Sequence, residues 1–104
     1  MEMRKTRSLI QVAAVLLAEP DSRHWGYDLI KRSGERSAVV YPMLTKMLNE
    51  GWLVDGWEDS TAINEKRPPR RYYELTDAGK QELGAALRSA RDDRRFSALN
   101  LGWA

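Results

Sequence analysis

The densest basic run in the sequence is KRPPRR at 66–71, which contains no acid. Lysine and arginine side chains bind phosphate groups through charge-assisted hydrogen bonds. Pro68 and Pro69 limit the conformations of the run, which lowers the cost of ordering it on binding. The shorter groups RKTR at 4–7 and KR at 31–32 are explained equally well by solvated surface. The run therefore indicates a polyanion-binding segment, with candidate contacts at Lys66, Arg67, Arg70 and Arg71.

Side chains for catalysis are scarce. The chain has one histidine, His24, and no cysteine, so it lacks a nucleophile–base pair and a set of nitrogen and sulfur metal ligands. Its carboxylates stand singly or beside arginines, as in RDDRR at 91–95, which is typical of a solvated helix surface. No glycine-rich phosphate loop follows a strand-like run. We therefore expect no enzyme activity, no catalytic residue, no metal site and no cofactor.

Length and composition predict one small domain. The chain has 104 residues, of which 42% are hydrophobic, and a net charge of +2. Charge placement is therefore more informative than the total. The absence of cysteine excludes a disulfide framework and fits the reducing cytoplasm. The longest apolar run, VAAVLLA at 12–18, is too short to span a bilayer and lacks a signal-peptide cleavage pattern.

The first predicted helix, 6–18, is apolar on two sides. One stripe at helical spacing contains Leu9, Val12, Ala13 and Leu16, and a second contains Ile10, Ala14 and Leu17. A helix that is apolar on both sides is buried on both sides. In so short a chain, the simplest cover for the second stripe is a partner subunit. Pro20 ends this helix, and a break extends to residue 24.

Two further helices frame the middle and the end of the chain. The second covers 26–34, with Gly34 as its C-terminal stop. The last begins at Thr76, a good N-cap, and continues to about residue 95. Along it, Leu83, Leu87 and Ala90 recur at helical spacing. The tail FSALNLGWA has no clear period.

The third predicted helix, within 37–53, carries a proline near its start. Ser37 as N-cap would leave Pro42 costing at most one backbone hydrogen bond. A start near Val39 or Val40 would make the proline harmless. On a helical wheel the core face contains Val40, Tyr41, Leu44, Met47 and Leu48, and the opposite side is formed by Ala38, Val39, Pro42, Met43, Thr45, Lys46 and Asn49.

Two strands follow this helix, at 52–58 and 71–75, because both segments are rich in aromatic or β-branched residues. They form a hairpin with a long basic loop, in which Arg71 either contacts the ligand or covers the sheet edge. Three helices followed by a basic hairpin form a winged helix-turn-helix. We therefore predict a mainly α fold with a small β-hairpin, a DNA-binding domain at 1–75 and a C-terminal dimerisation helix and tail at 76–104.

The outer side of the third helix is suited to the DNA major groove, which admits one α-helix. Its small and neutral side chains allow close approach, and Lys46 can reach a phosphate or a guanine edge. Since only Asn49 offers an amide and no arginine is present, direct base readout should be sparse. Shape and phosphate contacts should carry much of the affinity.

Three segments together resemble the PadR family of transcriptional regulators: GYDLIKR at 26–32, YPMLTKMLNEGWL at 41–53 and RPPRRYYELTDAGKQEL at 67–83. The residues in the family pattern are Gly26, Tyr27, Tyr41, Pro42, Leu44, Gly51, Leu53, Tyr72, Tyr73, Leu75, Thr76 and Gly79. The resemblance covers about residues 8–87. Its short C-terminal helix is typical of the short-tailed group. One departure is Trp25 in the place where the family often has histidine, which leaves the role of His24 open.

The resemblance implies a homodimeric, cytoplasmic, nucleoid-associated regulator, usually a repressor on a palindromic operator, with recognition helices about 34 Å apart. The implied DNA-binding residues are Ser37, Ala38, Val39, Tyr41, Pro42, Thr45 and Lys46, with Lys66, Arg67, Arg70 and Arg71 in the hairpin. The implied dimer interface contains Leu9, Ile10, Ala13, Leu17, Leu83, Leu87 and Ala90. Some members respond to small hydrophobic ligands, so such an effector is a candidate partner and Trp103 a candidate contact.

Two other functions stay open at this stage. The sparse base-reading face and small size also fit an architectural or recombination accessory factor of a mobile element. Binding to tandem direct DNA sites would favour this function, whereas binding to one inverted repeat would favour a repressor. A winged helix used only for protein contact is a third hypothesis, which the acid-free basic hairpin argues against.

Overall fold

The computed structural model describes residues 6–59 and 68–94, and this part of the chain folds into four helices and a three-stranded sheet. The predicted fold class, a mainly α winged helix-turn-helix with a small sheet, is confirmed. Lys66, Arg67, Trp103 and the rest of the tail lie outside the described residues. The elements are α1 (Arg7–Ala18), β1 (His24–Trp25), α2 (Gly26–Ser33), α3 (Ser37–Asn49), β2 (Leu53–Trp57), β3 (Arg71–Leu75) and α4 (Asp77–Arg91).

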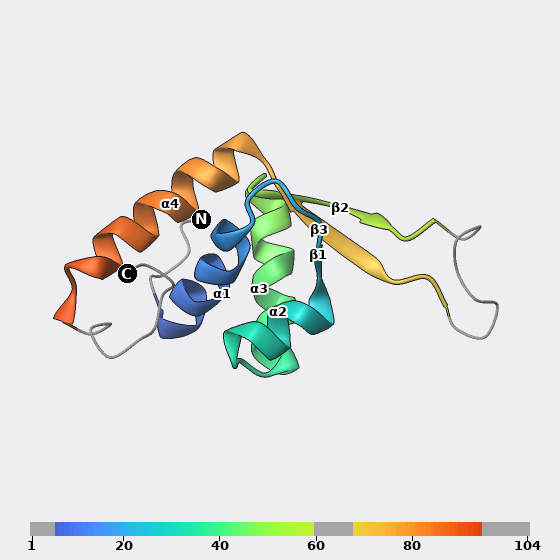
Figure 1. Ribbon diagram of the computed structural model, residues 1–104, viewed down its shortest axis with the longest axis horizontal. Helices are drawn as coiled ribbons and strands as arrows, with labels where there is room; N and C mark the ends of the chain where they lie inside the picture. The colour runs from blue at the N-terminus through green and yellow to red at the C-terminus, as the bar shows by residue number, and fades with distance from the viewer. Residues whose placement is uncertain (1–5, 60–67, 95–104) are drawn as a thin grey trace.

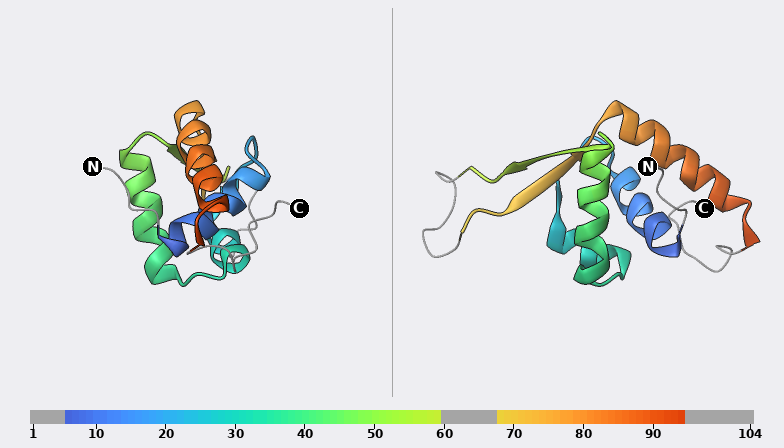
Figure 2. Two further views of the ribbon diagram at one scale, coloured as in Figure 1. Left: turned by 90° about the vertical axis from the view of Figure 1, so that its left-hand side faces the viewer. Right: turned by 180° about the vertical axis from the view of Figure 1, so that it is seen from behind.

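The helices gather into one body, and the β2–β3 hairpin projects from it (Figure 1). α3 lies at one side of this body, and the view from behind shows it in front, next to the base of the hairpin (Figure 2). The core lies between the helices and the inner face of the sheet. Its fully buried larger side chains are Leu16, Leu29, Leu44, Met47, Leu53 and Leu83, with Val12 and Val40.

α1 begins at Arg7 because the Thr6 side chain caps it, accepting a hydrogen bond from the Leu9 N–H at 3.1 Å. Its first predicted apolar stripe is buried. In the second stripe Ile10 is buried, while Ala14 and Leu17 are half-buried. Ile10 packs with Ala86 and Ala90 of α4. The burial of Ile10 therefore does not require a partner subunit, and a partner's contact with the rest of the stripe stays a prediction.

The predicted dimer residues are divided between these two buried clusters. Leu9, Ala13 and Leu83 lie in the main core, and Ile10 and Ala90 lie in the α1–α4 cluster. Leu17 and Leu87 are half-buried and pack against the core. Their role in a dimer stays a prediction.

Strand β1 was not predicted. The expected break extends to residue 24, whereas His24 and Trp25 pair antiparallel with β3, His24 opposite Tyr73 and Trp25 opposite Tyr72. The sheet order is β1-β3-β2. A strand of two residues is too short to show alternation, so no periodic signal could reveal it. Pairing with β3 places His24 in the protein interior.

His24 has a structural environment. Its side chain is 4% exposed, and its Nε2 donates to the Glu19 carbonyl oxygen at 2.9 Å. Desolvation by burial lowers the pKa of His24, against the opposing effect of the Glu19 hydrogen bond. The imidazole is therefore neutral near neutral pH, and it joins the end of α1 to the start of the sheet.

α3 begins at Ser37 and has Arg36 as N-cap, without a side-chain capping bond. The prediction of Ser37 as N-cap and the alternative of a start near Val39 are both wrong. Pro42 consequently lies inside the helix and cannot donate to the Ala38 carbonyl. One turn later the Thr45 hydroxyl donates to the Tyr41 carbonyl at 3.1 Å.

The end of α3 is joined to the start of α4. Gly51, with φ of 77°, turns the chain out of the helix in a conformation that favours glycine. The hydroxyl of Thr76 donates to the Gly51 carbonyl at 2.6 Å, and the Thr76 N–H donates to the Trp52 carbonyl at 3.1 Å. The same hydroxyl accepts from the Gly79 N–H at 3.0 Å, which confirms Thr76 as the N-cap of α4.

Among the described residues, none of the helices has the length and apolar character needed to span a membrane.

Candidate nucleic-acid interface

α3 presents a continuous exposed stripe to solvent. Val40, Met43, Leu44 and Met47 are buried and fix the orientation of the helix. The exposed side chains recur at helical spacing on the other side and are all small, uncharged or basic. They are Ser37, Ala38, Tyr41, Pro42, Thr45, Lys46 and Asn49.

The core-facing side of α3 is rotated from the predicted one. Met43 was expected on the outer side, yet it is 8% exposed and belongs to the core. Tyr41 was expected in the core, yet it is 46% exposed. Methionine fills irregular core space readily, whereas a buried tyrosine hydroxyl needs a partner. Val39 and Leu48 are half-buried and pack against the core, so Val39 is not part of the exposed stripe.

The two described arginines of the hairpin have different surroundings. Arg71 begins β3, and its Nε donates to Asp55 Oδ2 of β2 at 2.6 Å. Arg70 precedes the strand, and its guanidinium lies 4.8 Å from the centre of the Tyr27 ring. Of these two arginines, Arg71 forms an ion pair, with Asp55, whereas Arg70 forms none with another described residue. The positive charge at the hairpin base is therefore carried mainly by Arg70.

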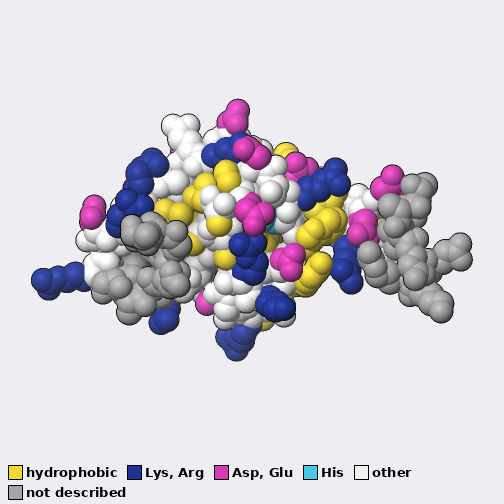
Figure 3. All heavy atoms as spheres, viewed as in Figure 1, with side chains coloured by type: hydrophobic (Ala, Val, Ile, Leu, Met, Phe, Trp, Pro, Cys, Tyr) yellow, Lys and Arg dark blue, Asp and Glu magenta, His cyan; other side chains and the backbone are white. Residues whose placement is uncertain are grey.

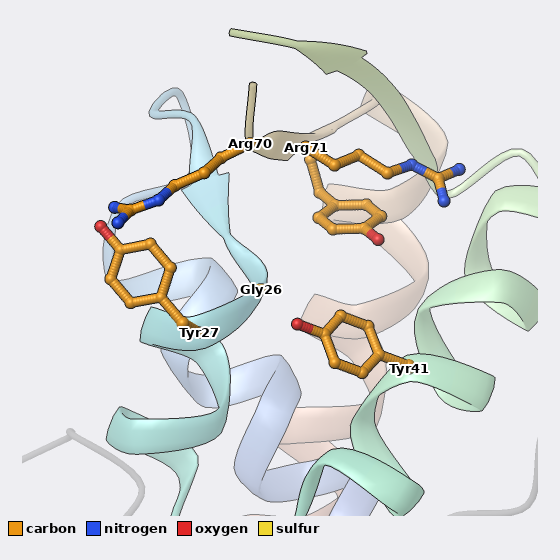
Figure 4. Close-up of a pocket in the computed structure, with 6 residues that line it drawn as sticks. Gly26, Tyr27, Tyr41, Arg70 and Arg71 are labelled. Carbon is orange, nitrogen blue, oxygen red and sulfur yellow. The ribbon is translucent and has the colours of Figure 1, made fainter. Parts of the chain in front are cut away.

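A cleft separates α3 from the base of the hairpin. It has a volume of about 330 Å³. In Figure 4 the Arg70 side chain reaches over Tyr27 on one side, while Arg71 extends to the other side. The hydroxyl of Tyr41 points into the space between them. The cleft is lined by Gly26, Tyr27, Tyr41, Arg70, Arg71 and Tyr73.

Gly26 permits this cleft to have its shape. A methyl group added at Gly26 would lie 2.8 Å from the Tyr41 hydroxyl oxygen and 2.9 Å from a ring carbon of the same side chain. The Tyr41 ring therefore lies directly on the first residue of α2.

Burial raises the pKa of the Tyr73 hydroxyl, although the Arg71 guanidinium lowers it, so this phenol stays protonated near neutral pH.

Charges of both signs are interspersed over the helical body, and hydrophobic side chains gather where the hairpin leaves it (Figure 3). Exposed aromatic residues on the elements that meet there include Tyr27 of α2 and Trp57 of β2, the latter 65% exposed. Within residues 6–59 and 68–94, no cluster of three or more histidine and acidic side chains is arranged to hold a metal ion. The chemistry that this surface offers is recognition of an anion beside an exposed helix.

The structure brings together residues that the sequence analysis placed apart. Tyr41 of α3 and Arg70 and Arg71 of the hairpin, all predicted contacts, share the cleft. Gly26, Tyr27 and Tyr73 line it too, but the sequence analysis gave them no binding role. They occur within the motifs GYDLIKR and RYYEL, but no pattern within either motif shows that distant tyrosines converge.

The sequence pattern of the transcriptional regulator PadR-like family matches residues 15–85, which is more than half of the chain. The chain belongs to the PadR-like family of transcriptional regulators. This membership confirms the resemblance drawn from the three motifs and supports a DNA-binding regulator. No curated protein matches the chain.

Solved structures show the same fold. A PadR family transcriptional regulator from Eggerthella lenta DSM 2243 has 24% identity and a TM-score of 0.58, over 76% of this chain and 70% of that one. A PadR family transcription regulator from hypervirulent Clostridium difficile R20291 has 22% identity and a TM-score of 0.60, over 79% and 86%. The circadian clock associated protein Pex from Anabaena has 15% identity and a TM-score of 0.63, over 84% and 76%.

The geometry explains two parts of the PadR-like pattern in this chain. Thr76 and Gly79 stand where α4 starts against the α3–β2 turn, and a methyl group at Gly79 would overlap the Trp52 carbonyl. Gly26 and Tyr41 stand where α3 contacts the first residue of α2. The first pair fixes the joint between α3 and α4, and the second pair shapes the cleft beside the exposed stripe.

Proposed function

We propose that this PadR-like chain is a sequence-specific transcriptional repressor that binds a palindromic operator as a homodimer. The observation that carries the proposal is the exposed stripe of α3 next to a hairpin base that holds Arg70. A helix without bulky or acidic side chains on its outer face enters the major groove closely. The adjacent hairpin is then placed to contact the backbone or the minor groove.

Affinity would come mainly from phosphate contacts and DNA shape. Lys46 is the one charged side chain of the α3 stripe, and it is exposed, so it can reach a phosphate or a guanine edge. Tyr41, Pro42 and Thr45 offer close contact and few hydrogen bonds to bases. The predicted contacts Lys66 and Arg67, which lie outside the described residues, extend the same basic hairpin. The dimer would act in the cytoplasm on nucleoid DNA.

Selection of bound sequences from random duplex DNA tests DNA binding, symmetry and half-site spacing together. A repressor dimer should recover one inverted repeat with half-sites about one helical turn apart. Recovery of tandem direct sites would favour an architectural accessory factor. An absence of salt-sensitive DNA affinity would refute DNA binding and favour a protein-contact role.

Lys46→Ala provides a sharper test on the selected duplex. It should lower DNA affinity about 10-fold and reduce the number of phosphate contacts, as measured by the salt dependence of affinity, by about one. Arg88→Ala is the matched control, because it removes one positive charge from the exposed surface of α4. The double change Arg67→Ala with Arg70→Ala should weaken binding further. Equal affinity of all these variants and the wild type would show that the DNA face is assigned wrongly.

A small hydrophobic effector remains a candidate regulator of release. Thermal-shift measurements with phenolic compounds test for it, because a ligand that binds only the folded state raises the melting temperature. A compound that raises the melting temperature and also releases DNA would identify the effector class.

A further inference from the structure

The cleft between α2, α3 and the hairpin has the composition of an anion seat. Its lining contains two guanidinium groups and three phenol groups, and no carboxylate. Phenol and guanidinium groups all donate hydrogen bonds to phosphate oxygens. The volume of about 330 Å³ exceeds what one phosphate group requires, and the cleft is open to solvent. It therefore accommodates a group that belongs to a larger molecule.

The two arginines have separate roles there. The carboxylate of Asp55 binds Arg71, so the charge of that guanidinium is largely compensated. Arg70 instead stacks on Tyr27, with 4.8 Å from its guanidinium carbon to the ring centre. Figure 4 shows this guanidinium at the hydroxyl end of the Tyr27 ring. Stacking orders the arginine before any ligand arrives, which reduces the cost of binding.

Tyr41 connects the cleft to the recognition surface. It belongs to the exposed stripe of α3 and also lines the cleft. Its ring lies against Gly26, so the hydroxyl lies beside the first residue of α2. A duplex that lies along the α3 stripe and continues toward the hairpin passes the mouth of the cleft. The anion nearest to this path is a phosphate of the DNA backbone.

We propose that this cleft seats one backbone phosphodiester of the bound DNA, with Arg70 supplying the charge and Tyr41 and Tyr27 supplying hydroxyl donors. The inference rests on the proposed DNA-binding function and adds a specific contact to it. The seat fixes the register of α3 on the duplex, because a phosphate contact positions the protein without reading the base. Gly26 is a positioning residue, since it sets where the Tyr41 hydroxyl lies.

The experiment combines protein variants with DNA that has one uncharged methylphosphonate linkage at a time. Scanning this linkage along the selected duplex should locate one position that lowers wild-type affinity about 10-fold, the value of a charged hydrogen bond. Arg70→Gln and Tyr41→Phe should each weaken binding to unmodified DNA. Both variants should lose little further affinity when the methylphosphonate is placed at that position, because the side-chain group that binds this phosphate is already missing.

The control variants separate the seat from general electrostatics. Arg88→Gln lowers the charge equally, yet it should retain the full loss from the linkage at that position. Gly26→Ala should reproduce the effect of Tyr41→Phe with little change in thermal stability, because its methyl group meets the movable end of a side chain. Circular dichroism melting curves of every variant show whether the fold is retained.

Each result decides between distinct conclusions. If the wild type binds no duplex, the proposed function fails. If the wild type binds and every variant loses affinity equally from each linkage, the phosphate seat is wrong and the function stands. If inorganic phosphate perturbs the tyrosine NMR signals of the cleft while DNA does not, the cleft is a small-anion site and the proposal is overturned.

Discussion

Replacing Gly79 with alanine tests how α4 is joined to the rest of the domain. A methyl group at this position would overlap the Trp52 carbonyl oxygen and would lie 2.8 Å from the Trp52 carbonyl carbon. An ordinary contact of this kind begins at 3.4 Å, and the neighbour here is backbone that cannot rotate away. The start of α4 would therefore withdraw from the α3–β2 turn by more than half an ångström.

The expected loss of stability is large for one methyl group. Withdrawal weakens the two hydrogen bonds from Thr76 to Gly51 and Trp52, which contribute about 1 kcal/mol each. Overpacking adds about 1–3 kcal/mol, and the better helix propensity of alanine returns at most about 1 kcal/mol. The free energy of unfolding should fall by about 2–4 kcal/mol, which lowers the melting temperature by roughly 10–25 °C.

Gly84→Ala is the matched control in the same helix. Its methyl group would meet only the Arg88 Nη1 at 3.3 Å, the end of a flexible exposed side chain. It should stabilise the protein by about 0.5–1 kcal/mol through helix propensity. Urea titration monitored by tryptophan fluorescence measures both variants. Similar midpoints for the two variants would refute the reasoning, since helix propensity would then account for both.

Three further predictions concern pH, the helix interior and the hairpin. His24 titrates near 6.5 when unfolded and has a lower pKa in the fold, so stability should fall as the pH drops below 6.5 toward the folded pKa. His24→Gln should remove this part of the pH dependence of the urea midpoint, and an unchanged profile would contradict it. Pro42→Ala should raise the free energy of unfolding by about 1 kcal/mol, because α3 regains a hydrogen bond to Ala38. A lower urea midpoint would count against that account. Asp55→Asn should free Arg71 and steepen the logarithmic salt dependence of DNA binding by about 0.9, whereas an unchanged slope would show that Arg71 does not reach a phosphate.

Local sequence signals predicted most of the elements. Thr76 and the glycines at 34 and 51 indicated helix boundaries, because a cap and a left-handed residue act within one turn of the chain. Periodicity likewise indicated the buried stripe of α1. It could not show what covers the other stripe, since α4 and a partner subunit both satisfy the same pattern. Ile10 packs with Ala86 of α4, which accounts for the burial of that one residue of the stripe.

The candidate site was predictable only in part, because it depends on contacts between distant segments. The wheel of α3 placed Tyr41 in the core, since tyrosine is amphipathic and fits either side of a helix boundary. The missing constraint was Gly26, whose lack of a side chain makes room for the ring. The pairing of Arg71 with Asp55 depends on strand register, which follows from the β2–β3 pairing and not from the composition of the basic run.

The joint at Thr76 makes α4 a lever. Two hydrogen bonds bind its first turn to the backbone that leaves α3, so neither segment moves there without the other. α4 contains 15 residues and is about 22 Å long, so a tilt of about 5° at the joint displaces its far end by about 2 Å. The relation would hold in reverse: a contact that shifts the far end of α4 by one atomic radius would reorient α3 by a few degrees. Under the proposed function, a small displacement at the far end of α4 would thus change how the exposed α3 stripe meets DNA.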